Sequence, residues 1–378
     1  MKPAAATAVG QVCTRCVMDA SDPEITFDAA GVCHHCIEFD TVTRHRWYTG
    51  AEGQRRLDAM VGELRAAGRG RDYDCILGLS GGVDSSYLAL KCHEWGLRTL
   101  AVHVDAGWNS ELAVANIEKI LDHTGFDLHT HVVDWEEMRD LQLAFLRSGV
   151  SNQDVPQDHA FFANLYRFAN LHGIRHVLSG GNVATEGIFP KTWHGPAMDA
   201  INLRAIHARH GTQPLRQYRT VSFFELFFWF PRVRGLQVLR PLDFLDYRKA
   251  EAVAELEQRI GWRAYPRKHG ESLFTKFFQN HYLPQRFGYD KRRPHLSSLI
   301  VSGQMGRDEA LRKLAEPLYE PQELEIDIAY LCKKLRIPAD ELQQLMDLPR
   351  RVYTDYASWD RRFAVARVVN RALRRLRG

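Results

Sequence analysis

The sequence has no hydrophobic run long enough to span a bilayer. Its longest apolar stretch, residues 223–230, is far short of the roughly 20 residues that a transmembrane helix needs. The first ten residues lack a basic start followed by an apolar segment, so we also expect no secretory signal peptide. Together these absences predict a cytoplasmic protein without a membrane span.

An excess of charge of either sign is also missing. The 378 residues carry a formal net charge of +4, with 45% apolar and 25% charged residues. This balance is typical of a globular protein. So small a charge makes nucleic acid an unexpected partner, although it still allows a polyanionic ligand. At this length we expect two or three domains.

Cysteine is scarce outside the first forty residues. Four of the seven cysteines form two Cys-x-x-Cys pairs, Cys13 with Cys16 and Cys33 with Cys36, separated by sixteen residues. This spacing is typical of a four-thiolate zinc site. We predict structural Zn²⁺ there, because so short a segment has little core of its own. Disulfides or an iron–sulfur cluster are the alternatives. Four protein ligands leave no open position for chemistry.

The chain divides into four predicted regions. They are a zinc-binding module (1–38), a helical linker (39–71), an α/β domain (72–246) and a C-terminal helical region (247–378). In the third region, short apolar runs alternate with helical patterns, and strands are expected at 74–79, 99–104, 128–133, 176–178 and 236–239. This alternation predicts a parallel, doubly wound, Rossmann-like sheet whose ligands bind at the carboxyl ends of the strands.

A glycine–serine segment joins the first predicted strand to a helix, and its sequence is Ser80-Gly81-Gly82-Val83-Asp84-Ser85-Ser86. Glycines let backbone N–H groups approach a phosphate closely, and a helix N-terminus adds unpaired donors. The hydroxyls of Ser80, Ser85 and Ser86 can donate further hydrogen bonds. Asp84 would repel a bare polyphosphate, so its expected role is to hold Mg²⁺. A glycine turn with serine caps is the alternative, and the Walker pattern is absent.

This segment resembles the PP-loop of the ATP pyrophosphatase superfamily, which includes asparagine synthetases, GMP synthetases, tRNA thiolases and lysidine synthetases. The resemblance implies that ATP is split between its α and β phosphates, with Ser80 and Asp84 as catalytic residues. It also implies further contacts to ATP after the second and fourth strands, at His103, Asp105, Gly180, Gly181 and Asn182. A polar strand end at His103 and Asp105 is the alternative for that pair.

Two absences narrow the reaction. No cysteine lies between Cys92 and Cys332, which disfavours sulfur transfer beside ATP. Cys75 and Cys92 follow apolar patterns and are expected in the core. No part of the sequence combines a candidate cysteine nucleophile with enough residues to form a glutaminase domain. Ammonia, if it is the nucleophile, should therefore come from solution or from a separate subunit.

Over about residues 12–315 the chain resembles the N-acetyl sugar amidotransferases of bacterial surface-polysaccharide and flagellin-sugar biosynthesis. The resemblance is carried by segments 13–19, 31–33, 79–87, 104–112, 179–187, 268–272 and 287–292. It implies that the acetamido group of a sugar, expected to be UDP- or CMP-linked, becomes an acetamidino group. ATP, Mg²⁺ and Zn²⁺ are the implied cofactors, and a glutaminase subunit is the implied source of ammonia.

Several charged residues are candidates for this site, although each is more often a solvated surface group. Lys268 is the candidate catalytic cation, and Lys276, Lys291 and Arg292 are further candidates for contacts to the phosphates. Glu186 and His194 are candidates for substrate contact or for deprotonation of ammonium.

Two further segments have competing interpretations. The aromatic run at 223–230 predicts a core helix, with a docking patch as the alternative. The basic C-terminal helix, within 361–377, predicts a solvated face, with subunit docking or tRNA contact as alternatives. A homo-oligomer is left open. For the whole chain, a PP-loop tRNA-modifying enzyme and a non-catalytic nucleotide-binding regulator are the competing hypotheses.

Overall fold

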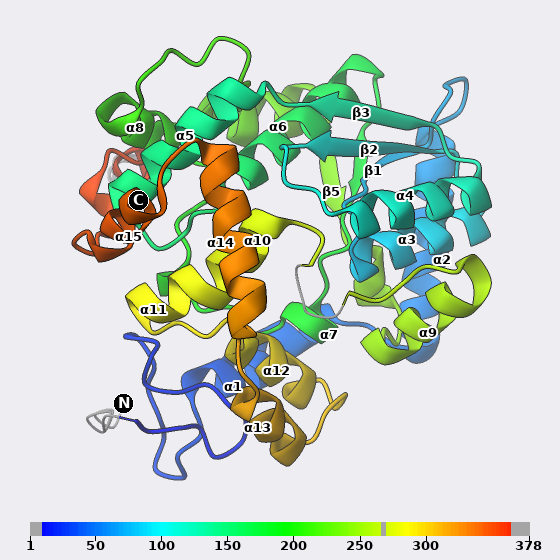
Figure 1. The fold of residues 1–378 in the computed structure, drawn as a ribbon. Coiled ribbons are helices and arrows are strands. Elements are labelled where there is room, and N and C mark those ends of the chain that lie inside the picture. Colours follow the sequence, from blue (N-terminus) through cyan, green and yellow to red (C-terminus); the bar gives the residue numbers. More distant parts are fainter. Residues whose placement is uncertain (1–9, 266–269, 364–378) are drawn as a thin grey trace, which may run out of the picture.

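The computed structural model describes residues 10–265 and 270–363, and their fold is shown in Figure 1. Five parallel strands form one sheet in the order β3-β2-β1-β4-β5. Their bounds are Cys75–Gly78 (β1), Thr99–Asp105 (β2), Leu128–Val132 (β3), His176–Leu178 (β4) and Gln237–Leu239 (β5). The predicted parallel sheet is confirmed, because each apolar run becomes a strand at its expected place.

The order of the strands creates a crevice beside β1. This strand pairs on one side with β2, where Cys75 lies opposite Thr99, and on the other side with β4, where Ile76 lies opposite Val177. The chain therefore builds the sheet outward in both directions from β1. At such a switch point the connections diverge, so the carboxyl ends of β1 and β4 form the edge where ligands bind in doubly wound sheets.

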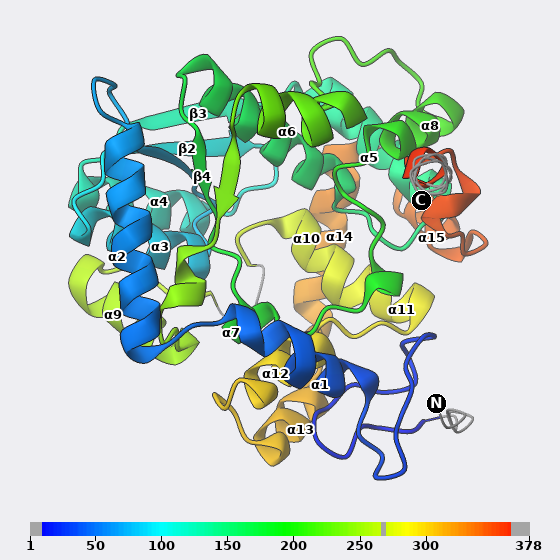
Figure 2. The same ribbon diagram turned by 180° about the vertical axis from the view of Figure 1, so that it is seen from behind.

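Helices cover both faces of the sheet, as Figures 1 and 2 show. Successive residues of β1 point to opposite faces, so Ile76 belongs to one hydrophobic core and Cys75 and Leu77 to the other. The first core is closed by α5 (Trp135–Ser148), α6 (Val155–Leu171) and α8 (Ala200–His210). The second core is closed by α2 (Gly50–Ala67), α3 (Val83–Glu94), α4 (Glu111–Thr124) and α9 (Lys249–Ile260).

The C-terminal region is helical, as predicted. Its helices are α10 (Leu273–Phe277), α11 (Leu283–Phe287), α12 (Arg292–Val301), α13 (Arg307–Ala315), α14 (Pro321–Leu335) and α15 (Ala339–Asp347). Residues of α10, α11, α14 and α15 form a third core around Trp108, where they meet residues of α5. Residues of α12 and α13 pack instead against Val17 of the cysteine module. The C-terminal region therefore packs on the side of the sheet where β2 ends.

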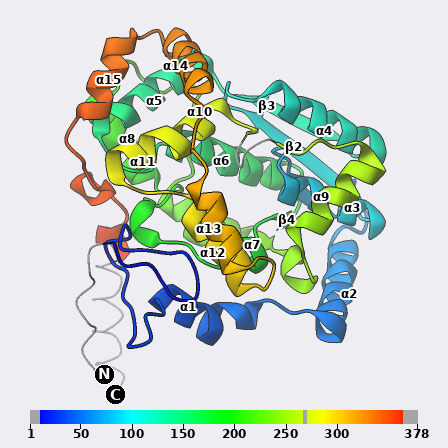
Figure 3. The same cartoon turned by 60° about the horizontal axis from the view of Figure 1, so that its bottom comes forward.

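The N-terminal cysteine module packs against this C-terminal region rather than standing alone (Figures 1 and 3). It continues into the short helix α1 (His34–Glu38). Arg307 at the start of α13 donates hydrogen bonds to the carbonyl oxygens of Cys13 and Cys16. Trp193, which follows α7 (Val183–Glu186), is buried in the same core as the four cysteines. The domain boundaries proposed from sequence stay a prediction.

The aromatic run at 223–230 is not the core helix that the sequence predicts. It forms part of a π-helical segment, Glu225–Val233, in which Phe230 is the buried residue. Phe224 and Phe228 are about half exposed, at 55% and 50%. Phe230 contacts Tyr166 of α6, and Leu226 packs partly buried against the same core, whereas Phe224 and Phe228 point away from it. Separately, no helix within the described residues is long and apolar enough to cross a membrane.

His159 in α6 is a buried histidine that is held in its neutral form. Its Nε2 atom accepts a hydrogen bond from the backbone N–H of Val221 at 3.0 Å. Its Nδ1 atom then carries the proton and donates to the carbonyl oxygen of Ala197, also at 3.0 Å. Burial disfavours the charged ring and lowers the pKa of His159 from 6.5 to about 4.

This histidine should make the protein less stable in mild acid. Between pH 6.5 and about 4 the unfolded chain binds a proton at His159 that the folded protein excludes, so the free energy of unfolding should fall as the pH falls. The full loss is about 3 kcal/mol. Denaturant unfolding at neutral and acidic pH measures it. His159→Gln should remove this part of the pH dependence, whereas the exposed His45→Gln should retain it. Equal pH dependence in both variants would contradict the assignment.

Candidate active site

A cavity of about 580 Å³ opens at the carboxyl ends of β1, β2 and β4. This volume is within the range of small-molecule sites. The predicted residues that line it are Ser80, Gly82, Asp84, Ser85, His103, Gly180, Gly181 and Glu186. Segments more than a hundred positions apart in the sequence therefore meet around one space.

The glycine–serine loop has a conformation that depends on Gly81. Its φ of +82° lies in the left-handed region that glycine adopts readily. The carbonyl oxygen of Gly81 accepts hydrogen bonds from the Trp262 indole N–H at 3.2 Å and from the Tyr265 hydroxyl at 2.9 Å. A Cβ on Gly81 would lie 2.9 Å from the carbonyl oxygen of Ala113. Both the backbone angle and the available space therefore require glycine at this position.

Donors of the loop converge at the N-terminus of α3. The hydroxyl oxygens of Ser80 and Ser85 lie 3.1 Å apart. The backbone N–H of Gly82 points to the Ser80 hydroxyl at 3.3 Å. The hydroxyls of Ser80 and Ser85 at a helix N-terminus are suited to an anion such as a phosphate, and the Gly82 N–H orients the Ser80 hydroxyl.

The second glycine-rich edge packs directly against this loop. A Cβ on Gly180 would lie 2.9 Å from the carbonyl carbon of Asp84 and 3.0 Å from the backbone nitrogen of Ser85. Such distances are too short for any side chain at position 180. Glycine therefore allows the segment after β4 to contact the backbone of the phosphate loop, and the two segments form one wall of the cavity.

Asp84 is held by two neutral donors. Its Oδ1 atom accepts hydrogen bonds from the Tyr247 hydroxyl at 2.7 Å and from the Asn182 side-chain amide at 3.1 Å. Burial, together with the nearby charge of Asp84, raises the pKa of Tyr247, so the phenol remains a donor. No described group donates to the other carboxylate oxygen. This fits a Mg²⁺ ligand, because Mg²⁺ is held through one or two carboxylates and the phosphates of a substrate. Asn182 positions Asp84 and does not line the cavity itself.

Three other predicted residues have different roles in the structure. His103 lines the cavity, with its Nδ1 atom 2.9 Å from the Leu79 carbonyl oxygen and its Nε2 atom 2.8 Å from the Asn109 amide nitrogen. Asp105 accepts a hydrogen bond from the backbone of Gly107 and shapes the turn after β2, outside the cavity lining. Ser86 is fully buried beneath the loop, and its hydroxyl has no hydrogen-bond partner among the described residues.

The structure places Lys276 and Arg292 in ion pairs, and their contacts to the phosphates stay a prediction. Lys276 forms ion pairs with Asp327 and Glu323 and fastens α10 to α14. Arg292 pairs with Asp290 at 2.8 Å and donates to backbone carbonyl oxygens at the end of α13. Their charges are already matched, and neither residue lines the cavity.

The cation that does line the cavity, within the described part of the chain, is Lys249 at the start of α9. The sequence places Lys249 at a helix start but does not distinguish it from other surface lysines. Lys268 and residues 364–378, which include most of the predicted basic helix, lie outside the described residues.

The same cavity is also lined by acidic and polar residues that the sequence prediction does not include. Gln157, Asp158 and Thr275 line it. Asp154, one turn before Asp158, accepts hydrogen bonds from the Thr275 hydroxyl at 3.0 Å and from the Gln157 amide at 3.1 Å. Burial raises the pKa of Asp154 to about 8 and that of Asp158 to about 6. Two aspartates four positions apart at a helix start were the only sequence signal for this pair.

Two other predicted candidates, Lys291 and His194, contact each other and do not line the cavity. The Lys291 ammonium lies 2.5 Å from His194 Nε2, to which it donates a hydrogen bond. Burial and the nearby Lys291 hold the pKa of His194 well below its usual value, so the imidazole is neutral. Lys291 also lowers the pKa of Asp158, against the effect of burial. It therefore acts here as a counter-charge to the aspartates.

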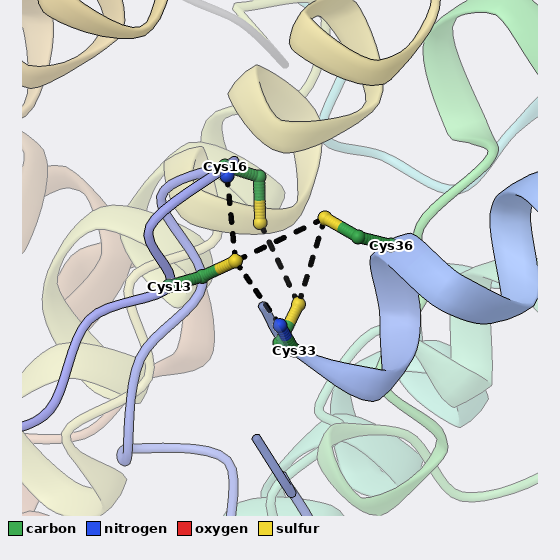
Figure 4. Close-up of side chains that lie close together, drawn as sticks. All are labelled: Cys13, Cys16, Cys33 and Cys36. Atoms are coloured by element: carbon green, nitrogen blue, oxygen red, sulfur yellow. Dashed lines mark hydrogen bonds between the residues drawn. The ribbon is translucent and has the colours of Figure 1, made fainter. Parts of the chain in front are cut away.

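The four predicted cysteine ligands converge in a second, separate site (Figure 4). All four are fully buried. The sulfur–sulfur distances are 3.7 Å for Cys16–Cys33 and Cys33–Cys36, and 4.0 Å for Cys13–Cys36. Four sulfurs arranged tetrahedrally at about 2.3 Å from Zn²⁺ would lie about 3.8 Å apart. Backbone N–H groups of Cys16 and Cys33 point to Cys13 Sγ, as expected around a thiolate. All seven cysteines are unpaired, so the disulfide alternative is wrong.

The fold is a doubly wound parallel α/β sheet, and its glycine–serine loop lies between β1 and α3, as a loop that resembles a PP-loop is expected to lie. Residues 271–370 match the family described as LPS biosynthesis protein WbpG-like, C-terminal domain. In the part of the chain that this match covers, it confirms the predicted resemblance to proteins of surface-polysaccharide biosynthesis. The comparison with curated proteins returned no match.

Two solved structures show distant similarity. An NH3-dependent NAD synthetase from Campylobacter jejuni is 13% identical, with 79% of this chain and 99% of that chain covered and a TM-score of 0.33. An NMN synthetase from Francisella tularensis is also 13% identical, with 80% and 99% covered and a TM-score of 0.29.

Proposed function

We propose that this protein is an ATP-dependent amidotransferase that converts the acetamido group of a sugar into an acetamidino group. The substrate is expected to be a UDP- or CMP-linked sugar of bacterial surface-polysaccharide or flagellin-sugar biosynthesis, and the reaction is expected in the cytoplasm. The observation that carries the proposal is one cavity that is lined both by the glycine–serine loop and by the acidic and polar groups Gln157, Asp158 and Thr275. The family match of the C-terminal region supports a role in polysaccharide biosynthesis.

The first step overcomes the low reactivity of an amide. The amide oxygen attacks the α-phosphorus of ATP, the bond from that phosphorus to the bridging oxygen breaks, and pyrophosphate leaves. Ser80, Ser85 and Lys249 are placed to hold the departing pyrophosphate. Asp84 would hold Mg²⁺, which neutralises the charge that develops on the phosphates. The product of this step is an O-adenylyl imidate.

The second step is nucleophilic. Ammonia adds to the imidate carbon, the carbon–oxygen bond to AMP breaks, and an amidine remains after AMP departs. None of the seven cysteines lines the cavity, and Cys75, Cys92 and Cys332 are buried in hydrophobic cores. We therefore propose that a separate glutaminase subunit supplies the ammonia. We also propose that Cys13, Cys16, Cys33 and Cys36 hold a structural Zn²⁺.

Incubation with candidate nucleotide sugars, ATP, Mg²⁺ and ammonium tests this function. Mass spectrometry should detect a sugar product in which NH replaces O, with equal amounts of AMP and pyrophosphate formed. Omission of either the acetamido sugar or ammonium should prevent the amidine. Release of AMP that depends on tRNA and weakens with salt would instead favour the tRNA-modifying alternative. Binding of ATP without turnover under every condition would favour a regulator.

A further inference from the structure

The start of α6 places at the cavity wall a carboxylate to which no described residue donates a hydrogen bond. Asp158 lines the cavity beside Gln157, Phe161 and Phe162. Its side chain accepts no hydrogen bond from any described residue. Asp154, by contrast, is satisfied by Thr275 and Gln157. Of the two carboxylates, Asp158 is therefore the one available to a ligand.

The surroundings of this carboxylate suit a small cation with several donors. The rings of Phe161 and Phe162 pack edge to face, with centroids 5.1 Å apart, and form an apolar wall beside Asp158. An ammonium ion can donate to a carboxylate and contact the face of an aromatic ring. A small apolar compartment also favours neutral ammonia over the ion, because a charge is costly to bury.

The geometry points to Asp158 as the group in the cavity wall that binds ammonium and removes its proton. This inference rests on the proposed function. The charged or titratable groups that influence Asp158 are Asp154 on the same helix, Lys291 opposite it and the buried Tyr218 behind α6. Burial already raises the pKa of Asp158 to about 6, close to the pH at which a general base works efficiently.

The proton and electron balance of the step is simple. Ammonium transfers one proton to the Asp158 carboxylate, and the lone pair that is freed on nitrogen attacks the imidate carbon. The carbon–oxygen bond to AMP then breaks, and AMP leaves with the electron pair of that bond. Protonated Asp158 returns its proton to solvent before the next turnover. No oxidant or reductant is required.

Two nucleophiles separate this role from a structural one. Asp158→Asn should lower kcat/KM for ammonium by about 100-fold or more, as expected for loss of general-base catalysis. The same variant should retain most of its rate with hydroxylamine, which is largely uncharged at neutral pH. Sugar-dependent pyrophosphate release without a nucleophile should also be retained. Asp122→Asn, an exposed change on α4, is the matched control and should leave all three rates unchanged.

A binding measurement tests the inference without turnover. Ammonium chloride should raise the melting temperature of the wild-type protein more than sodium chloride at equal ionic strength, because it binds the folded state. Asp158→Asn should lose this difference. It should also be at least as stable as the wild-type protein at neutral pH, since it removes a buried charge.

The outcomes can be distinguished. An equal loss of rate with ammonium and hydroxylamine, or a rise in the KM of the sugar with both, would make Asp158 a substrate-positioning residue and overturn the inference. An unchanged ammonium rate would do the same. Ammonium-specific stabilisation that requires Asp158, in a protein that makes no amidine, would refute the proposed function while leaving the ammonium site in place.

Discussion

Asp84→Asn should reduce sugar-dependent pyrophosphate formation by about 1,000-fold while leaving the fold intact. Asparagine preserves the size of the side chain and keeps an oxygen for the Tyr247 hydroxyl, which lies 2.7 Å from the native carboxylate. It removes the negative charge that would hold Mg²⁺ against the phosphates. Loss of such a contact costs several kcal/mol in the transition state. Rates measured over a range of Mg²⁺ concentrations should show that the variant needs more Mg²⁺ to reach half of its maximal rate. The maximal rate itself should also be lower.

Tyr247→Phe is the matched control for this prediction. It removes a hydrogen bond that orients Asp84 but retains the carboxylate, so the expected loss is only about 10- to 100-fold. Circular dichroism and melting temperature should show that both variants remain folded. An Asp84→Asn enzyme with nearly wild-type pyrophosphate formation would remove Asp84 from the metal site.

Removal of zinc should cause the largest loss of stability. The cysteine module has a small core of its own, in which the four thiols, Met18, Ile25 and Phe27 meet Ile188 and Trp193 from the α/β domain. In zinc-finger peptides the metal contributes about 10–16 kcal/mol of apparent binding free energy. Elemental analysis should find one zinc ion per chain. A strong chelator, or Cys33→Ser, should then lower the melting temperature and pyrophosphate formation together.

The loss should extend beyond the module because of how it is packed. Arg293 and Arg307 hold it to α12 and α13 by donating to the carbonyl oxygens of Val17, Cys13 and Cys16. Cys332→Ala is the control, since that cysteine is buried in a different core. It should retain the full zinc content. A structural zinc site would be refuted if the purified protein contained no zinc, or if it melted cooperatively at the same temperature before and after treatment with the chelator.

Features encoded by neighbouring residues could be predicted from sequence. The strands are short apolar runs bounded by turns, and all five appear where those runs lie. The phosphate loop is contained in seven consecutive residues, so its glycines, serines and aspartate are together in any fold that starts a helix there. Each Cys-x-x-Cys pair likewise brings two sulfurs together through local geometry. Each of these features depends on residues that are neighbours along the chain.

Charged side chains were the least predictable part of the site. Lys276 and Arg292 are correct in type for binding phosphates, but Lys276 pairs with acidic residues of α14 and Arg292 pairs with Asp290, just before its own helix. Lys249 and Asp158 occupy the cavity, although neither residue stands out in the sequence. A long side chain can reach many partners, and only the packing of distant helices selects one.

The aromatic run at 223–230 shows the same limit for apolar residues. Its composition is that of a core helix, yet Phe230 is the residue of the run that is buried, against Tyr166 at a centroid distance of 5.9 Å. Hydrophobicity favours burial, but the area available on the neighbouring helix limits how many side chains achieve it.

The sequence by itself determined the parallel sheet, the phosphate loop and the four-cysteine site, because each depends on residues that are close along the chain. Only the tertiary structure decided which cation and which carboxylate share the cavity with that loop, and which surface the cysteine module covers. Those choices depend on contacts between segments far apart in sequence, whose geometry is set by the packing of the three cores.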